Sequence, residues 1–279
     1  MINSEINYTT ILKNKRLISI AGDESKDFLN NLLTNDLSSL DKKDSIYSCL
    51  LTPQGKVNSH FFITKKNDKY LIIIDEELAK DFTEKLNFYK LRLNVIIETI
   101  NNLVVLFSLN KKINLSNAIV SFNDPRHEKF GKYFIIESAQ TSNVENLSDD
   151  NEYYKNFINQ NGLIDNIFTN LKDKFFSLEC NMKELNAIDF KKGCFVGQEN
   201  TARMNLKDKV SKRIILLDSK ENLKIDEDIL FENEIIGKVV SANPSFGVIK
   251  MKDYSQFKNK DLISKSGKIK INIPAWLNI

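Results

Sequence analysis

The chain has 279 residues, 42% of them hydrophobic, which is enough for one large or two ordinary folded domains. Its 40 lysines and arginines against 37 acidic residues leave a net charge of +3, which argues against nucleic acid as a partner. Because no basic-then-apolar leader opens the chain and no apolar run approaches the roughly 20 residues of a membrane span, we expect a cytoplasmic protein without a membrane partner.

The first half of the chain predicts strands that alternate with two helices. Residues 18–21 are typical of a strand that leads into a helix capped by Asp23, with apolar residues 28, 29, 32 and 33 on one face. Leu78, Phe82, Leu86 and Tyr89 recur at helical spacing and predict a second helix. The predicted strands are 45–51, 57–64, 70–74, 94–98, 103–109 and 133–137, with a turn at 52–55. This is an α+β pattern, without the regular βαβ alternation of a doubly wound sheet.

In the second half of the chain, the pattern of predicted elements changes after Lys212. Residues 142–151 predict a polar loop, and residues 153–158 predict a helix that stops at Asn161 and Gly162. Short β-rich runs follow at 213–217, 235–240, 246–251 and 268–273, with no helix pattern between them. We therefore expect a small C-terminal β-barrel or sandwich, and we place the domains at 1–208 and 209–279.

Several common kinds of site have no signature in this sequence. There are two histidines and no Cys-x-x-Cys pair, which argues against a structural zinc site, and the usual phosphate-loop, dinucleotide and nucleophile-elbow motifs do not occur. Cys49, Cys180 and Cys194 are odd in number and widely spaced, which argues against a disulfide framework and against a permanent iron–sulfur cluster. We expect no resident metal and at least one free thiol.

Residues 191–199 read KKGCFVGQE and place cations, a thiol and two glycines in one short stretch. Gly193 and Gly197 allow the backbone to take a positive φ or to approach a ligand closely. The lysines beside Cys194, Lys192 among them, favour a thiolate, which predicts a reactive cysteine. Each feature also has a plain structural explanation, because a free cysteine is often a small buried residue and paired lysines usually lie in solvent.

The end of this stretch and the residues after it add groups that can bind a ligand. Gln198 and Glu199 present an amide beside a carboxylate, a combination that can bind the donor and acceptor edge of a flat heterocycle. Arg203 lies four residues after Glu199, so it can form a helical ion pair or reach the carboxylate of a ligand.

Residues 192–199, KGCFVGQE, resemble the K-G-C-[YF]-x-G-Q-E signature of the YgfZ family. These are folate-binding proteins of iron–sulfur cluster assembly or repair, related to the T-protein (aminomethyltransferase) of the glycine cleavage system. Further similar motifs cover nearly the whole chain. They are LTNDL at 33–37, LTPQGKV at 51–57, DPR at 124–126, SLECNM at 177–182, TAR at 201–203 and IGKVVS at 236–241.

The resemblance implies a T-protein-like α+β fold with antiparallel sheets, in which two halves surround a folate site and a small β-barrel closes the chain. It implies tetrahydrofolate or another reduced folate as cofactor. Glu179 would meet the aminopyrimidine ring, whose N–H donors suit a carboxylate. The remaining residues that it places at the cofactor are Asn35, Asp36, Gln198, Glu199 and Arg203.

One departure from the related T-protein bears on the chemistry. The T-protein has adjacent acidic residues a few positions after its counterpart of Gly55, and one of them acts in aminomethyl transfer, whereas Ser59 and His60 stand there in this chain. Without that carboxylate we do not expect ordinary aminomethyl transfer. His60 is then either a neutral hydrogen-bonding group inside the sheet or a pH-sensitive folate contact.

The leading hypothesis is a tetrahydrofolate-binding accessory protein that supports assembly or repair of iron–sulfur enzymes. Its catalytic residues would be Cys194, as the reactive thiol, and Lys192, which keeps that thiol as thiolate. Its partners would be reduced folate and iron–sulfur client or assembly proteins. Two alternatives stay open, namely a folate-dependent aminomethyl or one-carbon transferase that uses His60 or Asp36, and a scaffold that docks a partner on its barrel.

Overall fold

The computed structural model describes residues 7–110, 113–207 and 210–279. The chain divides into two compact units, and each unit combines segments that are distant in the sequence. The first contains the described part of Met1–Leu51, together with Asn58–Tyr154 and Leu185–Val196. The second contains Thr52–Val57, Lys155–Glu184 and the described part of Gly197–Ile279. The boundary predicted between residues 208 and 209 falls on residues outside the described ranges, and it stays a prediction.

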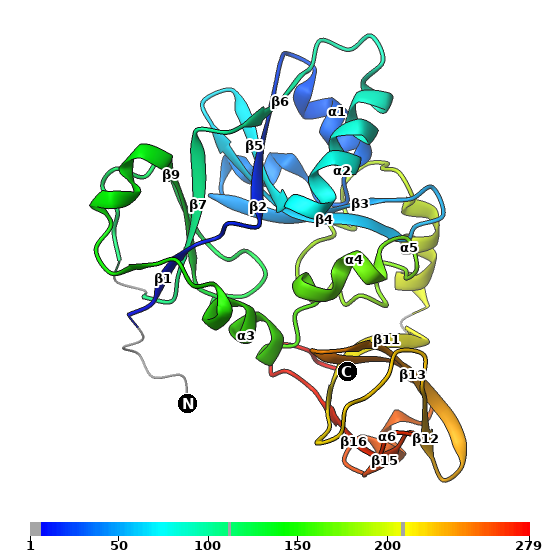
Figure 1. Ribbon diagram of the computed structural model, residues 1–279. Coiled ribbons are helices and arrows are strands. Elements are labelled where there is room, and N and C mark those ends of the chain that lie inside the picture. Colours follow the sequence, from blue (N-terminus) through cyan, green and yellow to red (C-terminus); the bar gives the residue numbers. More distant parts are fainter. Residues whose placement is uncertain (1–6, 111–112, 208–209) are drawn as a thin grey trace. The chain divides into compact units, whose positions relative to one another are not determined.

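The first unit contains a five-stranded sheet in the order β3-β4-β5-β2-β6 (Figure 1). Its strands are β2 (Lys15–Ala21), β3 (Ser45–Leu51), β4 (Val57–Lys66), β5 (Lys69–Asp75) and β6 (Ile96–Ile100). The pairs β4–β5, β5–β2 and β2–β6 are antiparallel. Every residue of β3 is buried, so that strand is covered on both faces. The predicted strands are confirmed, although β6 begins two residues later than expected.

A second five-stranded sheet in this unit has the order β10-β1-β7-β9-β8. Its strands are β1 (Thr9–Ile11), β7 (Leu103–Ser108), β8 (Val120–Asn123), β9 (Lys132–Glu137) and β10 (Leu147–Ser148). Its registered pairs are antiparallel except β1–β10, which is parallel. The prediction missed β1, β8 and β10, since strands of two to four residues are too short for an alternating pattern. β10 interrupts the predicted loop at 142–151.

Among the described residues of the first unit are also two α-helices and two 3-10 helices. They are α1 (Ser25–Leu32), η1 (Leu37–Asp41), α2 (Glu76–Lys90) and η2 (Ser138–Asn143). The predicted cap of α1 is wrong, because Glu24 holds the N-cap position and Asp23 instead accepts a hydrogen bond from Asn94 Nδ2 at 3.4 Å. The predicted stripe of α2 is confirmed for Leu78, Phe82 and Leu86, which are buried, whereas Tyr89 is only half-buried. Phe82 packs on Phe61 with ring centroids 4.7 Å apart.

The second unit contains a closed six-stranded barrel in the order β11-β14-β13-β12-β15-β16 (Figure 1). Its elements are β11 (Lys212–Asp218), β12 (Asp228–Phe231), β13 (Glu234–Ala242), β14 (Ser245–Lys250), α6 (Tyr254–Phe257), β15 (Leu262–Ile263) and β16 (Lys268–Asn272). β16 pairs with β11 and closes the barrel, so the predicted C-terminal barrel is confirmed. The expectation of no helix between its strands is wrong, because the single turn of α6 precedes β15. Phe257 of α6 belongs to the barrel core.

The other helices are α3 (Glu152–Gln160), which crosses the division between the units, and η3 (Asp165–Ile167), α4 (Phe168–Leu171) and α5 (Gln198–Leu206) in the second unit. The predicted helix stop after α3 is confirmed, since Gly162 has a φ of +66°. In the parts of the chain that the structure describes, no helix is both long enough and apolar enough to cross a membrane.

Candidate functional site

In the first unit, the loop after α1 is held in place by the side chain of Asn35. Its Nδ2 donates to the carbonyl oxygens of Tyr47 at 2.8 Å and Asn186 at 2.9 Å, and its Oδ1 accepts from the backbone N–H of Asp36 at 2.9 Å. The Asn35 amide therefore ties three chain segments together, and both of its donors are used within the protein.

The same loop binds the segment that leads to Cys194. Thr34 Oγ1 donates to the carbonyl oxygen of Ala187 at 2.7 Å, and the N–H of Asp189 donates to the carbonyl oxygen of Thr34 at 3.0 Å. Asp36 is half-buried, and its Oδ1 accepts from Ser38 N at 2.8 Å as the N-cap of η1. The LTND and KGC motifs, which the Lys192–Leu33 hydrogen bond joins across 159 positions of the sequence, are thus neighbours in the fold.

Lys192 also links these two motifs. Its Nζ donates to the carbonyl oxygens of Asn30 at 2.7 Å, Leu33 at 2.6 Å and Asn35 at 3.0 Å, and it lies 5.3 Å from the centroid of the Phe195 ring. Burial lowers the pKa of Lys192 to about 8, although the nearby carboxylates act in the opposite direction and raise it. An ammonium has three N–H donors, and the three carbonyl oxygens use all of them. Lys192 therefore caps the end of α1, and it can act on Cys194 only through its positive charge.

Cys194 is exposed, whereas Cys49 and Cys180 are buried. Burial raises the pKa of the Cys49 thiol, which further reduces its reactivity. Gly193 does not have a positive φ, and a Cβ added there would meet no atom within 4 Å, so one side of the Cys194 loop is open. Among the described residues, no group of three or more histidine, cysteine or acidic side chains is arranged to hold a metal ion.

A cavity of about 460 Å³ lies beside Asn35 in the first unit. Most of the residues that line it have polar side chains, and they include Asn35, Asp44, Ser45, Tyr47, Asn123, Asp124, Glu128 and Asn186. The lining combines amides, hydroxyls and carboxylates, so it can form hydrogen bonds with a polar ligand.

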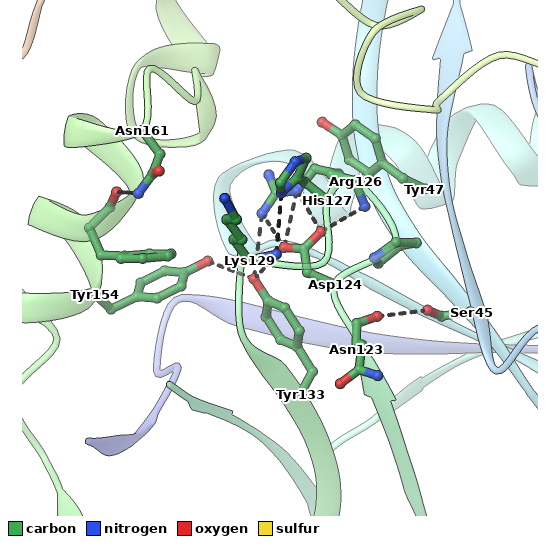
Figure 2. A network of polar contacts seen from close by, with 12 residues as sticks. Ser45, Tyr47, Asn123, Asp124, Arg126, His127, Lys129, Tyr133, Tyr154 and Asn161 are labelled. Atoms are coloured by element: carbon green, nitrogen blue, oxygen red, sulfur yellow. Dashed lines mark hydrogen bonds and ion pairs between the residues drawn. The ribbon is translucent and has the colours of Figure 1, made fainter. Parts of the chain in front are cut away.

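Asp124, which lines this cavity, forms a buried ion pair with Arg126 (Figure 2). Arg126 Nε donates to Asp124 Oδ1 at 3.0 Å and Nη2 to Oδ2 at 2.8 Å, and both side chains are fully buried. The guanidinium lies 4.9 Å from the ring centroid of Phe62 and 5.3 Å from that of Tyr47. The sequence marked DPR as a motif but assigned these residues no role; the only signal was a charged pair within an otherwise ordinary turn.

His60 is buried in β4, and its Nδ1 shares a hydrogen bond of 2.9 Å with the hydroxyl of Tyr47. Of the two possibilities that the sequence left open, this geometry matches a hydrogen-bonding group inside the sheet. Because Tyr47 also lines the cavity, His60 contributes to the site by orienting that tyrosine.

In the second unit, Glu179 is 8% exposed, and its Oε2 accepts from the N–H of Phe176 at 3.0 Å. Its carbonyl oxygen accepts from the N–H of Ile214 in β11 at 2.8 Å, which fixes the segment on the barrel. No other described group hydrogen-bonds the Glu179 carboxylate, so Oε1 is available to a ligand.

The segment of Glu179 packs beside α5, which begins in the KGCFVGQE motif. Gly197 caps α5 with a φ of +77°, and the hydroxyls of Ser177 and Thr201 lie 3.3 Å apart. Asn200 Nδ2 donates to the carbonyl oxygen of Gln54 at 2.8 Å, which joins α5 to the PQG turn. Three motifs that are far apart in the sequence therefore converge in this unit.

The predicted site residues fall into two groups, one in each unit. Asn35, Asp36, Lys192 and Cys194 belong to the first unit, and Glu179, Gln198, Glu199 and Arg203 belong to the second. Glu199 and Arg203 are exposed on α5, and within the described chain no ion pair joins them. That the two groups line one folate cavity stays a prediction.

Comparison with known proteins agrees with these motifs. The chain is 28% identical over 218 residues to a mitochondrial protein of Pyricularia oryzae named iron-sulfur cluster assembly factor IBA57 homolog, and 29% identical over 233 residues to its namesake in Neurospora crassa, in each case over 74% of this chain. It is 26% identical over 221 residues to the tRNA-modifying protein YgfZ of Buchnera aphidicola, over 71% of this chain and 69% of that protein. The chain is a relative of the IBA57 and YgfZ proteins. No protein-family model matches it.

The YgfZ-like chain spans about half the length of these IBA57 relatives, 56% of the Pyricularia protein and 52% of the Neurospora protein. Its fold is similar to the crystal structure of the glycine cleavage system aminomethyltransferase T from Bartonella henselae, with a TM-score of 0.73. The likeness covers 96% of this chain and 86% of that structure at 11% identity. The expected T-protein-like fold is confirmed.

Proposed function

We propose that this protein binds a reduced folate and supports the assembly or repair of iron–sulfur enzymes. The names of its relatives support the iron–sulfur role, and the T-protein-like fold supports a folate site. The IBA57 relatives are longer than this chain, so their names support the proposal only through the part that this chain matches. Its partners would be reduced folate and iron–sulfur client or assembly proteins.

The observation that carries the folate part is the carboxylate of Glu179. It is nearly buried, one oxygen is fixed by Phe176 N, and the other is available. The aminopyrimidine end of a pterin offers adjacent N–H donors, which a fixed and desolvated carboxylate binds well. Gln198, Glu199 and Arg203, which belong to the same unit as Glu179, would contact the rest of the ligand.

An accessory role has more support here than one-carbon transfer. A transferase would need His60 or Asp36 in place of the missing acid. His60 is buried and hydrogen-bonded to Tyr47, and one oxygen of Asp36 caps η1. Cys194, in contrast, is exposed and free to react with a partner. The cytoplasmic location stays a prediction, since the fungal relatives are named mitochondrial, and so does the lack of a nucleic-acid partner.

Replacing Glu179 with glutamine should weaken tetrahydrofolate binding by about 10–100-fold, because a hydrogen bond to a charged group contributes about 1.5–3 kcal/mol. Glutamine retains an oxygen for Phe176 N, so the segment should keep its conformation. Isothermal calorimetry with tetrahydrofolate measures the change, and Glu234→Gln, at an exposed position of the barrel, is the matched control. Equal affinity in wild type and Glu179→Gln, or no binding by folded wild type, would contradict the folate proposal.

Replacing Cys194 with alanine should abolish the rescue of iron–sulfur enzyme activity in a strain that lacks its own relative of this protein. The substitution removes an exposed side chain, so the free energy of unfolding should change by no more than about 0.5 kcal/mol. Titration of the native protein with a thiol reagent should modify Cys194 rapidly and the two buried cysteines slowly. Full rescue by Cys194→Ala would show that the Cys194 thiol is not the reactive group.

A further inference from the structure

The end of α2 and the start of β6 expose a cluster of large apolar side chains. Phe88 is 74% exposed, Leu91 83%, Leu93 36% and Ile96 51%. These four residues, the α2–β6 patch, lie within nine positions of the chain. Exposed apolar residues are normally scattered singly over a surface, so this clustering indicates an interaction site.

The fold itself gives no reason for leucine at position 91. Leu91 has a φ of +49° and a ψ of −113°, a conformation that strains any residue with a side chain. Its side chain is almost fully exposed, so it contributes little to the core. The buried face of α2 is formed instead by Leu78, Phe82 and Leu86. A strained and exposed leucine is expected where a partner, and not the core, uses the side chain.

The loop that carries the patch is firmly anchored to the rest of the unit. The N–H of Asn94 donates to Glu24 Oε2 at 2.6 Å, and Val95 is buried. Gly22 allows the loop to approach closely, because a Cβ there would lie 2.2 Å from the carbonyl oxygen of Asn94. Figure 1 shows this loop between α2 and β6, beside α1. The patch is therefore presented in one conformation, which lowers the entropic cost of binding.

The charge of the patch and the unpaired edge of β6 indicate what kind of partner would bind. Lys90 and Arg92 lie among the apolar residues, and in the described chain their side chains have no ion-pair partner. β6 is the edge of its sheet and pairs with β2 alone among the described strands. We propose that the α2–β6 patch docks an extended, acidic segment of a partner protein that carries apolar side chains and pairs with β6. This inference is independent of folate binding.

Two other occupants fit the patch less well. A lipid surface cannot provide partners for the N–H and C=O groups along the edge of β6. A second copy of the chain, related by a two-fold axis, would bring Lys90 and Arg92 near their own equivalents. An acidic partner strand avoids both problems.

The probe for this proposal is a blocked, fluorescent octapeptide of alternating leucine and glutamate, with an alternating leucine and lysine peptide as its counterpart. We expect the acidic peptide to bind at low salt and the basic one not to bind. Leu91→Gly should weaken binding about tenfold, as loss of a central apolar anchor does, and Arg92→Glu should weaken it at least as much. Fluorescence anisotropy measures both effects.

The design separates a docking role from a structural one. Leu91→Gly should unfold at the same temperature as wild type or higher, because glycine accepts the positive φ. Ile225→Gly, which also removes an exposed apolar side chain, is the matched control and should leave binding unchanged. Bound peptide should slow amide exchange along the outer edge of β6.

Several results would overturn the proposal. They are no binding of the acidic peptide, equal binding by Leu91→Gly, or unchanged exchange in β6. Binding to phosphatidylglycerol vesicles that Arg92→Glu abolishes would assign the patch to a membrane instead. A dimer seen in sedimentation that Leu91→Gly abolishes would assign it to a second copy of the chain.

Discussion

Replacing Arg126 with alanine should lower the free energy of unfolding by about 3–5 kcal/mol, because it leaves the carboxylate of Asp124 buried without its counter-charge. The pair is fully buried and bidentate, and the guanidinium also packs against the rings of Phe62 and Tyr47. Urea unfolding followed by tyrosine fluorescence and circular dichroism measures the loss. Because Asp124 and Tyr47 line the cavity, the variant should also deform it.

The double variant Asp124→Ala/Arg126→Ala tests the reason for this loss. It removes both charges, so its cost should fall below the sum of the two single variants by about 1–3 kcal/mol. Arg16→Ala is a matched control, because Arg16 pairs with Glu76 at the surface and should cost under about 1 kcal/mol. Additive costs for the Asp124 and Arg126 variants would show that the two side chains stabilise the fold separately.

Replacing Gly22 with alanine should lower the free energy of unfolding by about 2–5 kcal/mol, because the new methyl group clashes with backbone and the backbone is strained. The Cβ would lie 2.2 Å from the carbonyl oxygen of Asn94 and 3.2 Å from the Cα of Val95, and the φ of Gly22 is +109°. No side-chain rotation relieves contacts of this kind. Thermal and urea unfolding measure the loss.

Gly193→Ala is the control for Gly22→Ala. It adds the same methyl group where no atom lies within 4 Å and where φ is not positive. Its free energy of unfolding should stay within about 0.5 kcal/mol of wild type. A similar loss in both variants would mean that the close approach at Asn94 is not its cause, because the effect of alanine on the unfolded chain is stabilising.

Local patterns predicted the long elements of this fold and missed the short ones. The apolar stripe of Leu78, Phe82 and Leu86 is confirmed in α2, because a helix of 15 residues repeats its period several times. β12 and β15 have four and two residues, too few for a period, and they exist because the barrel must close. The cap of α1 shifted from Asp23 to Glu24 because Asp23 instead contacts Asn94, which lies 71 residues away.

The candidate site shows the same division between local pattern and tertiary contact. The sequence identified KGCFVGQE as a glycine-flanked cysteine motif, and Cys194 is indeed exposed. It predicted that Lys192 keeps Cys194 as a thiolate, but the Lys192 ammonium hydrogen-bonds three carbonyl oxygens at the end of α1 and in the loop after it. It assigned Gly193 and Gly197 the same conformational role, but only Gly197 has a positive φ.

The sequence by itself determined the α+β character, the C-terminal barrel and the relationship to the YgfZ proteins, because these depend on periodicity and on contiguous motifs. Only the tertiary structure decided which groups meet: the Asp124–Arg126 pair beneath the cavity, the Lys192 cap on α1, the single anchored oxygen of Glu179 and the exposed α2–β6 patch. The physical reason is that burial and hydrogen bonding depend on segments far apart in the chain, and no local pattern records which of them will be neighbours.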